Sequence, residues 1–363
     1  MDMERIVKNR IARGDFTEPR VIGRYGLNVM ASQNQRGDTS HLRALPPVSV
    51  ILTVMNEETH LHGAVSAALH SRYAGEIEVV IAVGPSHDRT LEIAEQLAKD
   101  DARVTVIPNP SGKTPNGLNA ALKASRFEIV VRIDGHSEIE SEYIDQAVAT
   151  LDETNAVNVG GIMAADGITP FQRAVARAMR SPIGVGAARF HTGGRAGPTD
   201  TVYLGVFRRS ALTHVGGYDE RFVRAQDWEL NHRLRQSGGT IWFNPELKVT
   251  YRPRNSIRAL ARQYFEYGRW RRAVSRHHKG TINFRYLAPP INLIINFFSI
   301  FLGILYSPVF FFAAGLYVTA ICMASLWIGK SFGERLRLPF VLITMHFCWG
   351  FGFILSPNTL LPR

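Results

Sequence analysis

Cysteine is almost absent from this sequence, and the two that occur, Cys322 and Cys348, both lie in apolar segments. That placement argues against a disulfide framework and against a cysteine-ligated metal site. The stretch MDMERIVKNRIARGDF at the N-terminus also lacks the apolar run of a secretory signal peptide. We therefore expect the main domain to remain in the cytosol.

Signatures of nucleic-acid binding are missing too, because the sequence has no zinc-finger spacing, no RNA-recognition motif and no basic zipper. The chain is nevertheless basic, with 42 Lys and Arg against 31 Asp and Glu. Many of these residues cluster in RALARQYFEYGRWRRAVSRHHK (258–279), directly before an apolar region. Such a cluster beside spanning helices is typical of a cytoplasmic flank, so membrane lipids, and no nucleic acid, are the predicted partners.

Charge is nearly absent from two C-terminal stretches, residues 286–329 and 338–356. A spanning helix needs about 20 apolar residues. Because the loop KSFGERLR (330–337) is basic, three spans beneath a cytosolic domain satisfy the charge rule and predict a multi-pass protein of the cell's inner membrane. A paired re-entrant arrangement of the first two segments is the alternative. The three candidate segments are 291–306, 308–329 and 338–357.

Apolar runs alternate with helix-like stretches in the N-terminal third of the chain. This alternation predicts an α/β doubly wound, mostly parallel sheet, which binds ligands at the carboxyl ends of its strands. No Gly-x-Gly-x-x-Gly follows the first apolar run, which argues against a dinucleotide-dependent oxidoreductase. The predicted strands fall within 46–58, 77–90, 103–108 and 127–134, and the predicted helices within 61–72, 90–101 and 117–126.

The fourth predicted strand ends in an acid, a glycine and a histidine, in FEIVVRIDGHSEIE (127–140). Asp134 and His136 therefore lie at the expected ligand-binding rim, and Gly135 allows a sharp turn between them. A carboxylate suits Mg²⁺ or Mn²⁺, and an imidazole favours Mn²⁺. Alone, the same turn also fits a strand end that binds nothing.

Four motifs together resemble the family 2 glycosyltransferases, which are inverting nucleotide-sugar enzymes with a GT-A fold, Rossmann-like and mostly parallel. The similarity is greatest to membrane-anchored members of the succinoglycan glucosyltransferase type, which build bacterial exopolysaccharides. It covers residues 48–272 and continues into the membrane tail. The motifs are VSVILTVMNEE (48–58), HDRTLEIA (87–94), IDGHSEIE (133–140) and GGYDERFVRAQDWELNHRLRQSGG (216–239).

The resemblance implies roles for individual residues. Asp134 and His136 match the ligands of a divalent cation, Mn²⁺ or Mg²⁺, and Asp227 matches the general base that takes the proton of the acceptor hydroxyl. For Asp227, a helix N-cap is the structural alternative, and both readings can hold together. The implied contacts to the nucleotide-sugar are Thr53, Asn56, Glu57, Asp88, Lys113 and Asn119.

Two departures from the family pattern leave questions open. Val83-Gly84 stand where relatives often carry an acidic pair, so recognition of uracil by Asp88 is uncertain, although a UDP-sugar is preferred to a GDP-sugar. Glu266 replaces the glutamine of a Gln-x-x-Arg-Trp motif, which weakens the case for a processive polymerase. The implied acceptor contacts are Trp228, Arg269 and Trp270, with a simple interfacial helix as the alternative for the last two.

The sequence thus predicts a metal-dependent inverting hexosyltransferase that uses a nucleotide-sugar and a polyprenyl-diphosphate-linked saccharide at the cytosolic membrane face. A polyprenyl-phosphate sugar synthase and a catalytically dead nucleotide-sugar-binding scaffold are the alternatives. The expected divisions are a basic leader (1–45), a GT-A domain (46–252), an amphipathic interfacial helix region (253–285), a transmembrane region (286–357) and a short tail (358–363).

Overall fold

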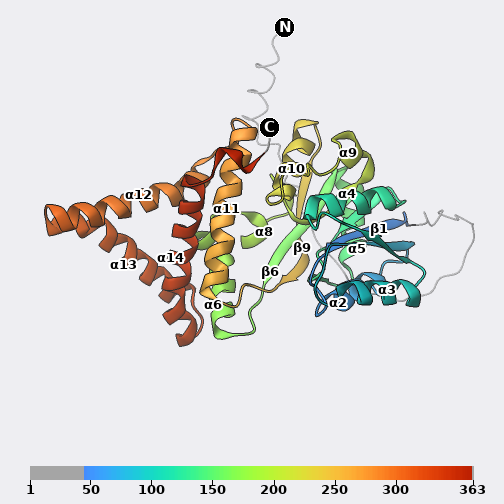
Figure 1. The fold of residues 1–363 in the computed structure, drawn as a ribbon, viewed down its shortest axis with the longest axis horizontal. Helices are drawn as coiled ribbons and strands as arrows, with labels where there is room; N and C mark the ends of the chain where they lie inside the picture. The colour runs from blue at the N-terminus through green and yellow to red at the C-terminus, as the bar shows by residue number, and fades with distance from the viewer. Residues whose placement is uncertain (1–44, 362–363) are drawn as a thin grey trace, which may run out of the picture. The chain divides into compact units, whose positions relative to one another are not determined.

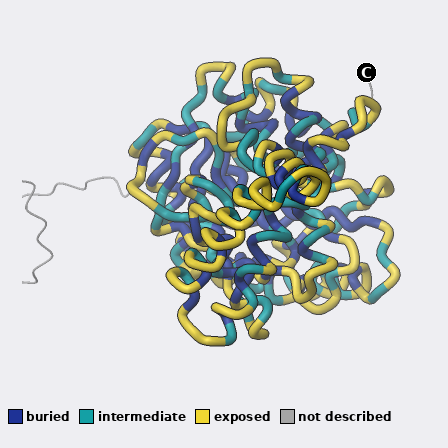
Figure 2. Tube along the Cα trace, turned by 90° about the vertical axis from the view of Figure 1, so that its left-hand side faces the viewer, coloured by how far each residue is buried: buried dark blue, intermediate teal, exposed yellow. Residues whose placement is uncertain are grey.

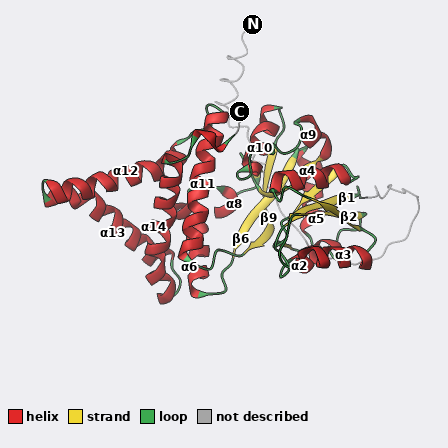
Figure 3. Ribbon diagram, viewed as in Figure 1, coloured by secondary structure: helices red, strands yellow, loops and turns green. Residues whose placement is uncertain are grey.

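One mixed sheet forms the core of the right-hand part of the molecule in Figures 1 and 3. The computed structural model describes residues 45–361, so nearly all of the expected leader lies outside the described residues. Within this range nine strands form a sheet of order β3-β2-β1-β4-β8-β6-β9-β5, with β7 beside β9. Strands β3, β2, β1 and β4 are parallel, and β8 runs antiparallel to β4 and β6. The strands are β1 (Val48–Val54), β2 (Ile77–Val83), β3 (Val104–Pro108), β4 (Ile129–Arg132), β5 (Glu138–Ile139), β6 (Asn158–Ala165), β7 (Gly197–Pro198), β8 (Tyr203–Arg208) and β9 (Ile241–Tyr251).

Helices follow the strands as the alternating pattern predicts, and each predicted element is found within a few residues. The helices of the catalytic domain are α2 (Leu61–Leu69), α3 (Thr90–Asp100), α4 (Thr114–Ala124), α5 (Tyr143–Thr154), α6 (Pro170–Met179), α7 (Pro182–Val185), α8 (Arg189–Thr192), α9 (Arg209–His214) and α10 (Gln226–Gln236). The C-terminal helices are α11 (Ile257–His277), α12 (Phe284–Leu305), η1 (Pro308–Phe311), α13 (Phe312–Ile328), α14 (Phe332–Ile354) and η2 (Asn358–Leu360).

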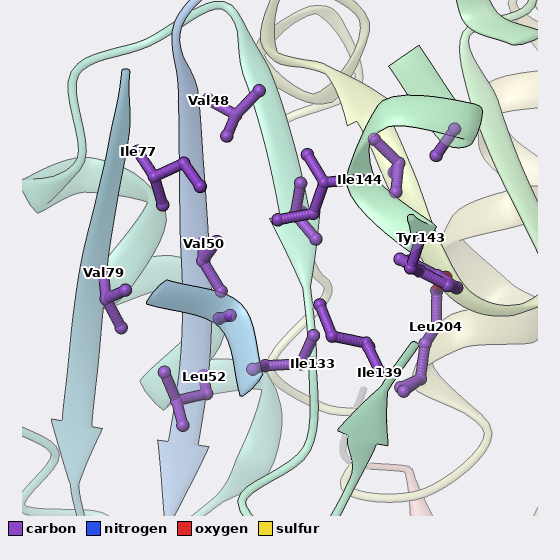
Figure 4. Close-up of a cluster of buried hydrophobic side chains, with 14 of the residues drawn as sticks. Val48, Val50, Leu52, Ile77, Val79, Ile133, Ile139, Tyr143, Ile144 and Leu204 are labelled. Carbon is purple, nitrogen blue, oxygen red and sulfur yellow. The ribbon is translucent and has the colours of Figure 1, made fainter. Parts of the chain in front are cut away.

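The sheet is buried on both faces, which explains why β1 and β2 read as continuous apolar runs. Val50 and Leu52 of β1 pack with helices α2 and α5 on one face, while Ile51 packs with α4, α9 and α10 on the other. Figure 4 shows the first of these clusters, in which Val48, Val50, Leu52 and residues of the neighbouring strands point toward one another. Figure 2 shows that the buried segments gather inside the molecule while the turns around them are exposed.

Three C-terminal helices, α12, α13 and α14, are long and apolar enough to cross a membrane, as the sequence predicts. Helix α11 does not stand alone but lies side by side with α14 (Figure 1). Their contact is closest at two glycines: a Cβ on Gly352 of α14 would lie 1.9 Å from the Phe265 carbonyl oxygen, and one on Gly268 of α11 would lie 2.0 Å from that of Trp349. The absence of side chains at these positions lets the two backbones touch.

This contact predicts a difference between two glycine-to-alanine substitutions. Gly352→Ala places a methyl group inside the α11–α14 contact and should cost about 1–3 kcal/mol or more, because the helices must separate. Gly315→Ala in α13 is the matched control, since its Cβ meets nothing within 4 Å. Thermal unfolding of the full chain in detergent should show a lowered midpoint for Gly352→Ala only. Equal midpoints for Gly352→Ala and the unsubstituted chain would contradict the packing described here.

Candidate active site

The polar motifs of the sequence meet at one edge of the sheet, because the parallel strands β1, β2, β3 and β4 all end there. Asn56 and Glu57 follow β1, Asp88 follows β2, and Asp134 follows β4. This edge is where doubly wound sheets place their ligand sites. The expected rim residues are therefore brought together by strand direction alone.

At the centre of this edge is a buried arginine, Arg132, the last residue of β4, whose side chain is only 4% exposed. Its Nη2 lies 2.8 Å from Oδ1 of Asp134, and its Nη1 donates to Oδ2 of Asp227 at 3.2 Å. The two acids come from separate elements, the β4 end and α10. One guanidinium therefore joins the expected metal ligand and the expected base in a single site.

Charge coupling within this group shifts the pKa values of its members. Burial alone would favour loss of the Arg132 proton, but Asp134 and Asp227 outweigh it and raise the pKa of Arg132, so it stays charged. Partial burial raises the pKa of Asp227, the Asp134 carboxylate raises it further, and Arg132 opposes both. Asp227 therefore holds a proton more readily than a free aspartate while remaining next to a fixed positive charge.

Asp227 lies in the first turn of α10 but does not cap the helix. The N-cap is Ala225, in a left-handed conformation with φ 60°, and no side chain caps this end. A non-glycine residue in this region costs of order 1–3 kcal/mol, and such strain is often found at functional sites. The backbone turn at Ala225 precedes α10 directly, and the Asp227 carboxylate contacts Arg132 instead of the helix amides.

His136 is oriented by a second carboxylate. Its Nδ1 lies 2.9 Å from Oε1 of Glu57, and this hydrogen bond is the main reason that the pKa of His136 is raised, with burial opposing it and Asp134 adding to it. Gly135 makes the turn possible, since a Cβ there would lie 2.6 Å from Cγ1 of Val54. A carboxylate that holds one ring nitrogen leaves the other, Nε2, aimed as a ligand.

The donors at this edge fit a divalent cation only with help from the substrate. Among residues 45–361 no group of three or more His, Cys, Asp or Glu side chains is arranged to hold a metal ion. Asp134 offers its Oδ2 oxygen, because Arg132 takes Oδ1, and His136 offers Nε2. Sites that bind Mg²⁺ or Mn²⁺ through one or two protein ligands complete the shell with phosphate oxygens and water, so this pair suits a nucleotide-bound cation.

The expected nucleotide-binding residues after β1 and β2 shape a pair of interlocked turns. Asn56, with φ 57°, accepts the His87 amide at 2.9 Å through its Oδ1. Asp88 accepts hydrogen bonds from the hydroxyl and amide of Thr90 and from the amide of Glu58, and these bonds, the hydroxyl first, lower the pKa of Asp88. Both side chains are thus engaged in holding the loops that would face a base.

The other expected nucleotide contacts lie around the end of β3. The Thr53 hydroxyl accepts from the Asn109 amide at 3.2 Å, and the Lys113 side chain is exposed on the following loop. Asn119 is already engaged: its amide bonds both the N–H and the carbonyl of Tyr218 at 2.8 Å. A cavity of about 440 Å³ opens beside this loop, lined by Asn109, Ser111, Asn116, Asn119, Lys123 and Glu220 among others.

Of the three expected acceptor contacts, Trp228 has the setting of a binding surface. It follows Asp227 on α10, stacks on His232 with ring centroids 5.3 Å apart, and receives the Arg271 guanidinium at 3.8 Å. Arg271 is itself buried between Trp228 and Tyr286, the latter at 3.7 Å, and donates to the Thr281 carbonyl at 2.6 Å. Among the described residues its Nε has no hydrogen-bond partner.

Arg269 and Trp270 are placed differently from Trp228. Arg269 pairs with Glu266 at 2.7 Å, so the glutamate that replaces the motif glutamine neutralises the motif arginine. Trp270 is 7% exposed and packs with Phe222 and Val274 beneath the loop that leads to α10. Both side chains therefore hold the acceptor-side loop and the helix rather than presenting a free surface.

Sequence reasoning overlooked the residues that connect these parts. Arg132 carries a readable signal, since a charged side chain that ends an apolar strand needs a buried partner. Glu229, which bonds Arg233 at 2.7 Å and His278 at 3.0 Å, and Arg271 carry none, because nothing in the local pattern tells them from surface charges.

Comparisons with known proteins identify similar chains. Residues 49–216 match the family described as Glycosyl transferase family 2. The succinoglycan biosynthesis protein ExoA of Rhizobium meliloti is 29% identical over 308 residues, which are 84% of this chain and 93% of that protein. A Methanococcus voltae dolichyl N-acetyl-alpha-D-glucosaminyl phosphate glucuronosyltransferase, which transfers a diacetamido-dideoxy sugar, is 23% identical over 84% of this chain and 95% of its own length.

Among solved structures, a mannosyltransferase from Pyrobaculum calidifontis, determined with GDP-Man and Mn²⁺, superposes with a TM-score of 0.58. It shares 18% identity and covers 84% of this chain and 86% of its own, so it shows the fold alone. Residues 49–216 are thus similar to a glycosyl transferase family 2 domain on a GT-A-type sheet, and these similarities support glycosyltransferase activity for the chain.

Proposed function

We propose that this protein transfers a hexose from a nucleotide-sugar to a hydroxyl of a lipid-linked saccharide at the membrane face, with inversion at the sugar carbon. The observation that carries the proposal is the position of Arg132 between Asp134 and Asp227. It sets an acid on the donor side and an acid on the acceptor side of one small site. Transfer between two bound substrates needs this arrangement, with a base only on the acceptor side.

Asp227 acts as the base in this proposal. Arg132 occupies its Oδ2, so Oδ1 is the oxygen that accepts the proton of the attacking hydroxyl. A single carboxylate serves an inverting displacement, in which the acceptor oxygen bonds to the sugar carbon as the nucleoside diphosphate departs from the opposite face. Paired carboxylates of the glycoside hydrolase type are not required, because the leaving group is a diphosphate.

Asp134 and His136 hold the divalent cation in this proposal, and Glu57 keeps the His136 ring in place. A bound Mn²⁺ or Mg²⁺ supplies positive charge that stabilises the departing diphosphate. Support comes from the Mn²⁺ and GDP-Man named for the Pyrobaculum calidifontis neighbour. The loops closed by Asn56 and Asp88 would receive the base, with UDP as the preferred carrier, and Lys113 is free to reach the diphosphate.

The acceptor enters from the membrane side. Trp228 is half-buried where the acceptor would enter, with His232 and Arg271 stacked on its ring, and Arg271 brings a positive charge for which no ion pair with a carboxylate is found among the described residues. The Methanococcus voltae relative, named for a dolichyl phosphate-linked sugar acceptor, supports a lipid-linked substrate. The apolar helices α12, α13 and α14 place such a lipid within reach, and the relative named for succinoglycan biosynthesis supports a role in polysaccharide assembly.

Replacing the base separates this proposal from transfer to a lipid phosphate. Asp227→Asn should lower transfer to the lipid-linked saccharide by about 10²–10⁴-fold, since the proton has no acceptor. Asp152→Asn, at an exposed surface pair with Arg208, is the control and should leave transfer unchanged. Nucleoside diphosphate release and product formation are measured in membranes over a panel of UDP- and GDP-sugars. Near-normal transfer by Asp227→Asn would favour a phosphate acceptor, which brings no proton to remove.

The raised pKa of Asp227 predicts the acidic side of the pH profile. A base must be unprotonated, so kcat/KM falls as the pH drops through the pKa of Asp227. Burial is the main cause that raises that pKa, and it persists when a cation neutralises Asp134, so the fall should lie above the pH at which an ordinary aspartate titrates. Rates measured at saturating metal between acidic and neutral pH locate this limb. A limb at or below the ordinary aspartate range would contradict the assignment.

Chelation tests the metal ligands. EDTA should abolish transfer, and added Mn²⁺ should restore it in the unsubstituted protein but not in Asp134→Asn. Glu57→Gln, which loosens the His136 ring without removing a ligand, should raise the metal concentration for half-maximal rate by about 10–100-fold. Full activity in EDTA would overturn the metal assignment while leaving the role of Asp227 untouched.

A further inference from the structure

Helix α14 is attached to α6 and α7 at its start and middle, and to α11 just after its end. At its start, Glu334 pairs with Arg177 of α6 at 3.4 Å. In its middle, Nε2 of His346 lies 2.8 Å from the Ile183 carbonyl of α7. After its end, the carbonyls of Ser356 and Pro357 accept from Arg276 of α11 at 2.9 and 3.0 Å. A helix held along its length by one domain cannot carry the chain to the other side of a bilayer.

Helix α11 keeps the C-terminal end of α14 on the same side of the membrane. The end of α11 returns to the catalytic helix α10, where His278 bonds Glu229 at 3.0 Å and Arg271 stacks on Trp228. Its start follows β9 directly, with Gln263 bonding the Tyr251 hydroxyl at 2.9 Å. Both ends of the α11–α14 pair therefore lie on the side of the catalytic domain (Figure 1).

The large exposed side chains of α14 are apolar and lie near its two ends, while residues 341–350 between them are buried or half-buried. The opposite side of the helix packs on α6 and α11. Exposed apolar groups on a helix backed by protein suit a position along the membrane surface. They are Phe332, Leu336 and Phe340 near the start and Phe351, Ile354 and Leu355 near the end.

Helices α12 and α13 form a hairpin that projects away from α14 (Figures 1 and 3). No charged residue occurs between residues 286 and 329. The apolar side chains at the hairpin tip are highly exposed, with Ile304 at 70%, Tyr306 at 75%, Val309 at 77% and Phe312 at 75%. Exposure of these side chains to water costs free energy, and their exposure to the hydrocarbon of a bilayer does not.

The backbone of the tip is capped from within. The Ser299 hydroxyl of α12 donates to the Phe310 carbonyl at 2.5 Å and accepts the Ala314 amide at 3.0 Å. The Tyr306 amide bonds the Leu302 carbonyl at 2.9 Å. Unpaired backbone groups are costly in lipid but not in water, so internal capping suits a turn that stays inside the bilayer.

From these observations we infer that the protein is seated in one face of the membrane. The α12–α13 hairpin enters the hydrocarbon and returns without emerging, and α14, with α11 behind it, lies along the surface. The arrangement extends the re-entrant alternative for the first two segments to the third. It sets the hairpin base beside the active site, because Tyr286 of α12 contacts Arg271, which contacts Trp228.

Single cysteines test this topology in the full chain. The background is Cys322→Ala with Cys348→Ala, and the reporters are Tyr306→Cys and Val309→Cys at the tip, Lys330→Cys before α14 and Asn358→Cys after it. A membrane-impermeant maleimide is added to spheroplasts, to inverted vesicles and to detergent extracts. We expect Lys330→Cys and Asn358→Cys to react only in inverted vesicles. The tip positions should react in both membrane preparations about tenfold less than in detergent, because a thiol in hydrocarbon does not ionise.

Two results would overturn the inference. Reaction of Asn358→Cys in spheroplasts would show that α14 crosses, and reaction of either tip cysteine in spheroplasts as fast as in detergent would show that the hairpin crosses. If a tip cysteine stays unreactive in detergent, it is labelled with bimane in denaturant and its depth is measured by fluorescence quenching in the membrane. Quenching by nitroxides placed deep in the acyl chains supports the inference. Quenching by aqueous iodide contradicts it. None of these readouts depends on the proposed transfer reaction.

Discussion

The structure of the active site depends on one buried cation. Arg132 brings a positive charge to the end of a strand that is otherwise apolar, and it is stable there because two carboxylates approach it from different elements. Without Arg132, Asp134 and Asp227 would repel each other at the same rim. With it, the sheet edge and the start of α10 are held together by one guanidinium.

A second chain of contacts links the active site to the membrane region. Trp228 follows Asp227, Arg271 stacks on Trp228, and Tyr286 at the base of the apolar hairpin stacks on Arg271. Each member comes from a different helix, α10, α11 and α12. The position of the hairpin base is therefore coupled to that of α10.

Much of the fold could be predicted from the sequence. The apolar runs that form β1, β2 and β4 are buried on both faces. Strands buried in this way carry continuous apolar residues instead of an apolar–polar alternation. The Asp-Gly-His turn was predictable because a glycine directly after an apolar strand allows a sharp turn, whereas the close approach of Val54 to Gly135 is visible only in the structure. The role of Trp270 was less readable, since the sequence cannot say whether an aromatic side chain on an amphipathic helix faces a ligand or, as here, Phe222.

The sequence by itself determined the order of strands and helices, the apolar character of the C-terminal segments and the residues at the strand ends, because these follow from local periodicity and hydropathy. Only the tertiary structure decided that Arg132 joins Asp134 to Asp227, that Glu266 neutralises Arg269, and that α14 lies against the catalytic domain over its whole length. The physical reason is that the partner of a buried charge or of an apolar face comes from residues distant in sequence, and only tertiary packing brings those residues together.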